Sequence, residues 1–365
     1  MALTAVLAGC RDRDAVSAAS VSSSRPAASA RRDEALRHAK VWAPPRVKPS
    51  DADFSVNTPG PDTFDAGADV DCTFVAEHVG GSTPKFKCAL PDGTHVKVKY
   101  GGPNGELPAE VAATRLLAAL GFPVDRVNRV HSVRCRGCPP LPYVALQCLE
   151  TSAPPSVCLQ GASDSTVVSF SPAVIERPIE GHKIEGVEDQ GWSWYELETI
   201  DERAGGSSRA EVDALRLVAM LLAHWDNKGA NQKLICPPGG GSDEACRTPI
   251  AAIGDLGGAF GPRKVDLVNW TRVRIWTDAR ECRVSMKSLP YGGATFPDTQ
   301  ISEAGRQFAL RLLGPLTRTQ LDTLFVSSGV TSYPHVLTTA HQPQSWTDAF
   351  LDKVDQIARG GPCPH

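Results

Sequence analysis

Residues suited to proton transfer and metal binding are concentrated in one short stretch, HWDNKGAN. It contains His224, Asp226, Lys228 and Asn231. A carboxylate can accept or orient a proton, and carboxylate and amide oxygens are the ligands that a hard cation such as Mg²⁺ prefers. A further carboxylate, Asp255, follows in the stretch GDLGG. These side chains either meet and hold a cation beside a reacting group, or they belong to a polar turn that simply faces water.

The segments around these residues predict that they come together. A helix is expected over 208–222, because a Ser-x-x-Glu capping pattern precedes apolar residues at helical spacing. Beyond the polar turn, QKLIC (232–236) is typical of a short strand, and PIAAIGDLGG contains a second short strand expected to end at Asp255. The Pro/Gly/Ser-rich segment between them is typical of a loop. Two strands joined in this way would bring Asn231 and Asp255 together at one end of the pair.

The first half of the chain predicts mainly strands. Short β-type runs separated by turn signals fill residues 72–100. The run THVKVKY alternates, which places Lys97 and Lys99 on the same face of a strand. The next segment, LPAEVAATRLLAALGF, predicts a helix that carries Glu110, since Pro suits the first turn and Gly suits the end. The runs VNRVHSVRC and STVVSFSPAVIERPI are typical of further strands.

The order of these motifs resembles the catalytic core of atypical protein-kinase-like enzymes, namely HipA-type kinases and, more distantly, phosphoinositide kinases. The stretch HWDNKGAN matches the pattern H-x-D-x-K-x-x-N of a kinase catalytic loop at all four of its defined positions. Asp255-Leu-Gly resembles the D-F-G element, with Leu in place of Phe. The resemblance covers about residues 72 to 260.

This resemblance implies an α+β fold with two lobes. A β-rich N-lobe would span residues 71–180 and a helical C-lobe residues 181–365, with ATP bound between them. Three more helices are expected in the C-lobe, at about 301–314, 317–327 and 346–358.

The resemblance also implies a role for each residue of the catalytic loop. Asp226 would act as the catalytic base toward an acceptor hydroxyl group, in a motif that begins at His224. Lys228 would reach the γ-phosphate of ATP. Asn231 and Asp255 would bind Mg²⁺, which bridges the phosphates.

A lysine of the N-lobe would bind the α- and β-phosphates and would be held by Glu110. Lys99 is favoured over Lys97 because it closes the strand. A G-x-G-x-x-G loop is absent, so Gly80 and Gly81 are the only candidates for a cover over the phosphates, and a plain hairpin turn explains them about as well. The absence of an A-P-E motif argues against a eukaryotic-type protein kinase.

Two other classes of function stay open at this point. The chain could be a pseudokinase that binds nucleotide without transferring a group, or a transferase that moves AMP or glutamate on the same fold. No segment indicates whether the acceptor is a protein, a lipid or a small molecule.

The cysteines and the first residues predict export. Eleven cysteines are more typical of an exported protein than of a cytosolic one. MALTAVLAGC (1–10) resembles the lipobox of bacterial lipoproteins, in which Cys10 would carry the lipid, although no Lys or Arg precedes the apolar run. The alternative is that the apolar start arose by chance and that the protein is cytoplasmic.

Residues 11–70 are rich in Ser, Ala, Arg, Pro and Asp and predict a disordered tether.

Spacing suggests roles for two cysteine pairs. Cys236 and Cys246 flank a loop between two expected strands, which predicts a disulfide across the base of a hairpin. Cys135-x-x-Cys138 leaves three possibilities open: half of a zinc site, a redox pair, or two separate disulfide partners, with structural bonding favoured.

Overall composition limits the partners. The net charge is −3, so no basic excess indicates nucleic-acid binding. No apolar run is long enough to span a bilayer, so membrane contact is expected only through a lipid on Cys10. A nucleotide and an unknown acceptor are the expected partners.

Overall fold

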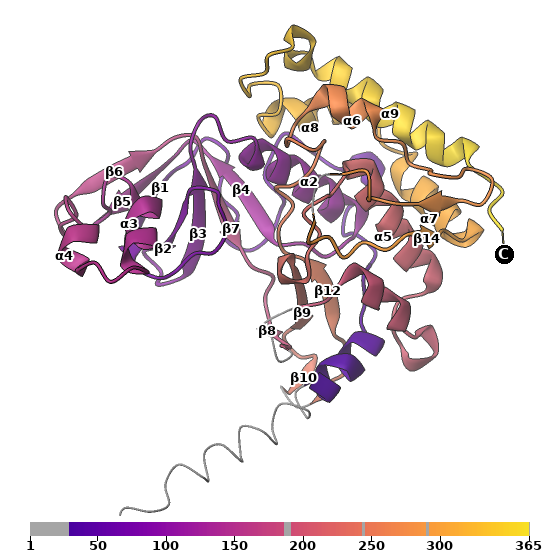
Figure 1. Ribbon diagram of the computed structural model, residues 1–365, viewed down its shortest axis with the longest axis horizontal. Helices are drawn as coiled ribbons and strands as arrows, with labels where there is room; N and C mark the ends of the chain where they lie inside the picture. Colours follow the sequence, from indigo (N-terminus) through magenta and orange to yellow (C-terminus); the bar gives the residue numbers. More distant parts are fainter. Residues whose placement is uncertain (1–28, 186–190, 243–244, 290–291, 365) are drawn as a thin grey trace, which may run out of the picture.

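The computed structural model describes residues 29–185, 191–242, 245–289 and 292–364, which form two lobes (Figure 1). One lobe is built on a β-sheet and the other mainly on helices, and α2 (Glu106–Leu120) lies between them. The predicted α+β fold with a β-rich N-lobe and a helical C-lobe is therefore confirmed.

The N-lobe sheet has seven strands in the order β4-β7-β3-β2-β1-β5-β6. Neighbouring strands run antiparallel, except β1 and β5, which are parallel. The strands are β1 (Asp69–Val75), β2 (Lys85–Ala89), β3 (His95–Tyr100), β4 (Arg126–Val130), β5 (Ser132–Arg136), β6 (Val167–Phe170) and β7 (Ala173–Arg177). The insertion between β5 and β6 contains two short helices, α3 (Pro142–Leu149) and α4 (Pro155–Cys158).

The two faces of β3 differ in the way that its sequence predicts. Val96 and Val98 are buried in the apolar core of the N-lobe, which α3 helps to cover. Because side chains alternate along a strand, Lys97 and Lys99 lie on the opposite face, toward α2. This face carries the charged residues of the candidate site.

The C-lobe contains the three helices expected near its end and one, α6, that was not expected. Its helices are α5 (Arg209–Leu222), α6 (Leu267–Arg272), α7 (Glu303–Leu313), α8 (Arg318–Ser327) and α9 (Pro343–Arg359). The α5 helix begins as its capping pattern predicts, since the hydroxyl of Ser208 accepts the N–H of Glu211 and the Glu211 carboxylate accepts the N–H of Ser208.

Short strands and 3₁₀ turns complete the C-lobe. The strands β8 (His182–Lys183), β9 (Gln232–Cys236) and β12 (Ile250–Ile253) form a small sheet, with β9 and β12 antiparallel as predicted. Two ribbons pair β10 (Gly241–Ser242) with β11 (Ala245–Cys246) and β13 (Arg283–Val284) with β14 (Thr299–Gln300). The 3₁₀ turns are η1 (Pro49–Asp51), η2 (Trp194–Thr199), η3 (Glu202–Ala204), η4 (Gly229–Asn231) and η5 (Thr338–His341).

The α2 helix is almost completely buried between the lobes. It packs against β4 and β7 on one side and against α8 on the other. It ends at Gly121, whose φ of 89° is left-handed and whose Cβ, if present, would lie 2.2 Å from the carbonyl oxygen of Ala43. Glycine is therefore required at the point where α2 meets the N-terminal segment.

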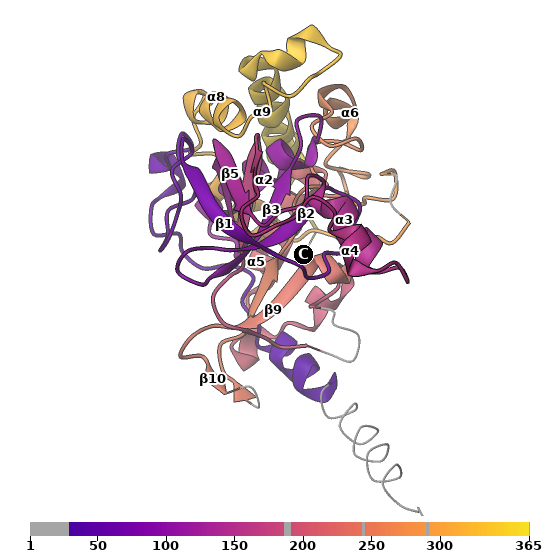
Figure 2. The same ribbon diagram turned by 90° about the vertical axis from the view of Figure 1, so that its left-hand side faces the viewer.

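That N-terminal segment corrects one prediction. Residues 11–70 were expected to be a disordered tether, but residues 29–70 are part of the folded unit. Residues 29–37 form a helix at the end of the molecule where β10 also lies, opposite α8 and α9 (Figures 1 and 2). The expectation failed because it rested on average composition, whereas a few well-spaced apolar side chains are enough to anchor this segment. The buried ones are Ala35, Leu36, Ala39, Val41 and Phe54.

Polar contacts fix this segment, which we call the N-terminal strap (residues 29–57), to both lobes. Arg32 makes an ion pair with Glu196 of the C-lobe. The indole N–H of Trp42 donates to the carbonyl oxygen at the end of α2. Arg115 of α2 donates to the carbonyl oxygen of Phe54 and to the side chain of Asn57. The expected lipid site, Cys10, lies outside the described residues.

All ten cysteines after Cys10 form disulfides. The disulfide predicted between Cys236 and Cys246 is present. The others join Cys72 to Cys88, Cys135 to Cys138, Cys148 to Cys158 and Cys282 to Cys363. Cys135 and Cys138 are bonded to each other, so they are not the two separate disulfide partners that were one of the expected possibilities. These bonds are compatible with an exported protein.

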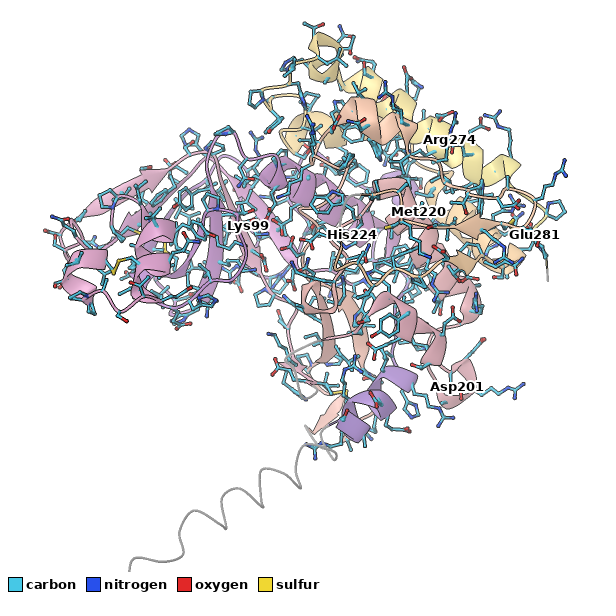
Figure 3. All side chains as sticks on the ribbon, viewed as in Figure 1. Lys99, Asp201, Met220, His224, Arg274 and Glu281 are labelled. Carbon is cyan, nitrogen blue, oxygen red and sulfur yellow. A yellow bond between two sulfur atoms is a disulfide. The ribbon has the colours of Figure 1, made fainter. Side chains whose placement is uncertain are left out.

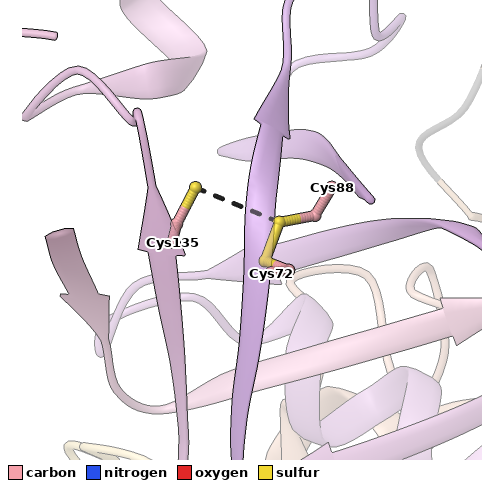
Figure 4. Close-up of side chains that lie close together, drawn as sticks. All are labelled: Cys72, Cys88 and Cys135. Carbon is pink, nitrogen blue, oxygen red and sulfur yellow. Dashed lines mark hydrogen bonds between the residues drawn. A yellow bond between two sulfur atoms is a disulfide. The ribbon is translucent and has the colours of Figure 1, made fainter. Parts of the chain in front are cut away.

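In the N-lobe core, the disulfide between Cys72 and Cys88 lies beside Cys135 (Figure 4). The sulfur atoms of Cys72, Cys88 and Cys135 lie within 4.8 Å of one another, and those of Cys88 and Cys135 are 3.9 Å apart. A sulfur atom in a disulfide has no proton to donate and is not a thiolate, so this is a packing contact rather than a metal site. Within the described parts of the chain, no helix is both long and apolar enough to cross a bilayer.

Candidate functional site

The loop after α5 and the loop after β12 lie against each other, as the sequence predicts. The N–H of Trp225 donates to the carbonyl oxygen of Gly258, and the N–H of Gly254 donates to that of Asn231. A Cβ at Gly258 would lie 2.8 Å from the Cβ of Asp226, so only glycine allows this approach. The two short strands thus bring the HWDNKGAN and GDLGG stretches into contact.

Within the first loop, Asp226, Lys228 and Asn231 form one polar group. The Nζ of Lys228 lies 3.2 Å from Oδ1 of Asp226. The side-chain amide of Asn231 donates to the carbonyl oxygen of Asp226. The Asp226 side chain is 26% exposed, so its carboxylate can be reached from solvent. These three residues could therefore meet a bound substrate.

His224 is placed differently from the other residues of the motif. It is fully buried and its ring lies 6.1 Å from that of Trp194. Burial lowers the pKa of His224 to about 4, so the imidazole is neutral at physiological pH. His224 is therefore less accessible than Asp226, and the catalytic role that its place in the motif predicts stays a prediction.

Asn227 is a supporting residue that the motif does not identify. Its side-chain oxygen accepts the backbone N–H groups of Thr295 and Phe296, and its amide donates to the carbonyl oxygen of His224. Asn227 is fully buried, so these bonds fix the turn between the histidine and the reactive side chains.

On the N-lobe side of the site, Lys99 lies at the centre of a group of carboxylates. Its Nζ is 2.8 Å from Glu110 and 3.6 Å from Asp255. The expected pair of Lys99 and Glu110 is therefore present. The ion pair between Asp255 and Lys99 connects the C-lobe to the N-lobe. Figure 3 shows Lys99 on the sheet side and His224 on the helical side of the same region.

Lys97 has a different partner, although it lies on the same face of β3. Both carboxylate oxygens of Glu176 are 2.7 Å from its Nζ. The Lys97 side chain is 33% exposed, whereas that of Lys99 is completely buried. The geometry thus supports the preference for Lys99 as the lysine held by Glu110.

Burial and neighbouring charges shift the pKa values of the residues in this group in different directions. Burial alone would lower the pKa of Lys99, but the carboxylates of Asp255 and Glu110 and two further acids outweigh burial and raise it well above its usual range. Burial would raise the pKa of Asp255, yet the Lys99 ammonium and the N–H of Gly257 hold it far below its usual range. In contrast, burial raises the pKa of Glu110. Asp255 is therefore one of the ionised carboxylates that face Lys99.

Glu106 is a second supporting residue that sequence reasoning missed. Its Oε1 lies 3.2 Å from Nζ of Lys99, one helical turn before Glu110. A signal for it existed, because residues four apart on a helix share a face and Glu110 was already assigned to Lys99. Glu106 also bonds to Thr83 and Lys264.

The Gly80-Gly81 loop connects β1 to β2 above this group. Gly81 has a φ of 87°, in the left-handed region that favours glycine. Its carbonyl oxygen accepts the hydroxyl of Tyr143 in α3. The same loop reaches the acids through Thr83, so it lies near the charged group.

The donor set of the site fits a hard divalent cation. Asp255 is ionised and its side chain is 25% exposed. The amide nitrogen of Asn231 is used in bonding to Asp226, so its oxygen is the atom that can face a cation. A carboxylate and an amide oxygen on adjacent loops suit Mg²⁺.

The chain is similar to a kinase of known structure. The crystal structure of the Helicobacter pylori proinflammatory kinase CtkA superimposes with a TM-score of 0.44 and 11% sequence identity, over 80% of this chain and 96% of that one. No protein-family model matches the chain, and no curated protein matches its sequence.

Proposed function

We propose that the protein is a phosphotransferase of the kinase type, acting with ATP and Mg²⁺ on an acceptor that carries a hydroxyl group. One observation carries the proposal. Lys99, held by Glu110, lies 3.6 Å from Asp255, and the loop with Asp226 and Asn231 lies directly beside Asp255. Phosphoryl transfer needs positioning and charge neutralisation more than covalent chemistry, and this site offers both.

Each residue has a role in this proposal. Asp226 accepts or orients the proton of the acceptor hydroxyl group, and Lys228 stabilises the charge on the transferred phosphoryl group. Lys99 binds the α- and β-phosphates, while Glu110 positions it. Burial keeps Lys99 dry, which strengthens its attraction to a phosphate.

Asn231 and Asp255 would hold the Mg²⁺, which neutralises phosphate charge when it is bound. The Gly80-Gly81 loop lies on the side of the site where a cover over the phosphates would be needed. His224 and Asn227 support the loop and do not touch reactants.

The proposal is tested with purified protein, Mg²⁺ and ATP labelled at either the α- or the γ-phosphate. The acceptor is unknown, so the first readouts are self-labelling and labelling of a bacterial or host cell extract. Label from the γ-position alone supports a kinase. Transfer from the α-position would instead show nucleotidyl transfer, and nucleotide binding with no transfer would show a pseudokinase.

The assignment of Asp226 is tested with Asp226→Asn. We expect transfer to fall by about 10²- to 10⁴-fold, because the base is lost, while Mg·ATP still binds. Asp348→Asn is the matched control, since Asp348 also pairs with a cation, Arg318, on an exposed surface remote in sequence from the loop. Full transfer activity in Asp226→Asn would refute the assignment.

We also propose that the protein is exported and attached to the cell envelope through a lipid on Cys10. The five disulfides support an oxidising location. Because ATP is scarce outside the bacterial cytoplasm, the acceptor would then lie where ATP is available, such as a host or neighbouring cell. Metabolic labelling with a palmitate analogue, compared between wild type and Cys10→Ala, tests the anchor.

A further inference from the structure

The Glu106 carboxylate joins three separate parts of the site. It accepts a hydrogen bond from the hydroxyl of Thr83 in the loop between β1 and β2. It lies 2.6 Å from Nζ of Lys264, which follows the GDLGG stretch, and 3.2 Å from Nζ of Lys99. Glu106 is buried, so water does not weaken these contacts.

The Glu106 side chain also lies directly on the GDLGG segment. A Cβ at Gly257 would be 2.0 Å from Cγ of Glu106, far closer than non-bonded carbon atoms approach each other. The glycine of Asp-Leu-Gly thus makes room for Glu106. This close packing indicates that the Glu106 carboxylate occupies a well-defined position beside Lys99.

More carboxylates surround Lys99 than are needed to balance the single positive charge of one lysine. Glu110 and Glu106 lie at 2.8 and 3.2 Å, and Asp255 and Glu176 follow at 3.6 and 3.8 Å. The lysine is completely buried, with four carboxylates within 4 Å of its Nζ. A phosphate can reach the ammonium only if one of the acids leaves.

We propose that Glu106 is an internal competitor that occupies the phosphate position at Lys99 and must be displaced when nucleotide binds. This inference rests on the proposed function. Glu106 is the acid that leaves because its other partners, Thr83 and Lys264, come from loops, whereas Glu110 lies deeper and Asp255 is needed for the cation. Its departure releases both loops together, so nucleotide binding is coupled to opening of the site.

The charges at Lys99 predict whether a substitution strengthens or weakens nucleotide binding. Glu106 and a phosphate are both anionic, and like charges at one ammonium repel each other. Removing the charge of Glu106 therefore favours the nucleotide. Replacing Glu110, one turn further along the same helix, instead changes the contact at 2.8 Å that positions Lys99, and this disfavours the nucleotide.

These two glutamates provide a matched pair of variants. We expect Glu106→Gln to lower the Kd of the intact protein for Mg·ADP by about three- to tenfold in calorimetric titration, and Glu110→Gln to raise it. Thr83→Val, which removes a partner of Glu106, should also lower the Kd. An unchanged or raised Kd in Glu106→Gln, with normal binding by wild type, would overturn the competitor role and leave the proposed function intact.

Hydrogen exchange gives a second readout that needs no nucleotide. Faster amide exchange in both residues 80–84 and residues 257–264 is expected in Glu106→Gln and Thr83→Val, with exchange in α9 unchanged. Unchanged exchange in both loops would contradict the coupling. If neither wild type nor any variant binds Mg·ADP or Mg·ATP, the proposed function fails, and the competitor role fails with it.

Discussion

At the scale of single residues, the two lysines of β3 show what alternation can and cannot decide. The run THVKVKY correctly places Lys97 and Lys99 on one face. It cannot decide which of them meets Glu110, because that depends on where α2 lies above the strand. In the structure Lys99 meets Glu110 and Lys97 meets Glu176 of the neighbouring strand.

Substitution of each lysine by methionine separates their roles. We expect Lys99→Met to weaken Mg·ADP binding at least tenfold, about 1.4 kcal/mol, because the phosphates lose their buried cation. Lys97→Met keeps that cation and should change the Kd by less than about threefold. Calorimetric titration measures both, and circular dichroism checks that both variants fold. Stronger loss in Lys97→Met than in Lys99→Met would reverse the assignment.

Residue patterns in the sequence identified most of the candidate site. Asp226, Lys228, Asn231 and Asp255 come together because two short strands of recognisable sequence separate them. Glu106 escaped notice because no motif contains it, although its spacing from Glu110 placed both on one face of a helix. The buried position of His224 also could not be predicted, since a motif gives the order of residues but not their depth.

At the scale of elements, α5 and α7 pack closely near the start of both helices. Gly305 of α7 lies against Asp213 of α5, and a Cβ at Gly305 would be 2.3 Å from the Cβ of Asp213. The Asp213 carboxylate accepts the N–H of Ser302 at the start of α7. The two helices are therefore joined at one point of very close approach.

Gly305→Ala tests this contact. In an isolated helix the change would be stabilising by up to about 1 kcal/mol. Here we expect it to lower the free energy of unfolding by about 1–3 kcal/mol, because α5 and α7 must move apart. Gly67→Ala is the control, since a Cβ there meets no atom within 4 Å. Urea denaturation measures both variants, and equal stability of wild type and Gly305→Ala would contradict this account.

Most elements could be predicted from capping residues and periodicity. The elements that could not be predicted have few local signals in the sequence. The helices α5 and α7 to α9 have clear apolar stripes or caps, whereas α3 and α4 are short and lie in a segment dominated by Cys and Pro. The N-terminal strap has only scattered apolar residues. Its order comes from contacts with residues far away in sequence, such as Arg115, which no local pattern reveals.

At the scale of the whole molecule, the disulfides differ in the length of chain that they close. The bond between Cys282 and Cys363 spans a sequence separation of 81, and that between Cys236 and Cys246 a separation of 10. A longer loop loses more conformational freedom in the unfolded state when it is closed. The first bond also holds the end of the chain against the C-lobe.

Replacing each pair by serine tests this difference. We expect the Cys282→Ser/Cys363→Ser variant to lose about 4–5 kcal/mol of unfolding free energy, and the Cys236→Ser/Cys246→Ser variant about 3 kcal/mol. Denaturation in guanidinium chloride under oxidising conditions measures both. A larger loss for the shorter loop would show that local packing, rather than chain entropy, dominates.

The N-terminal strap has a consequence for the position of the folded unit relative to a membrane, if Cys10 carries the proposed lipid. Were the chain free up to residue 70, a lipid on Cys10 would allow the folded unit to move as far as about 200 Å from the bilayer. Because folded structure already exists at residue 29, the fully extended connection is at most about 65 Å long. The candidate site would then stay within a shallow layer next to the bilayer, so an acceptor in a host or neighbouring cell would have to approach the surface of the cell that carries the protein.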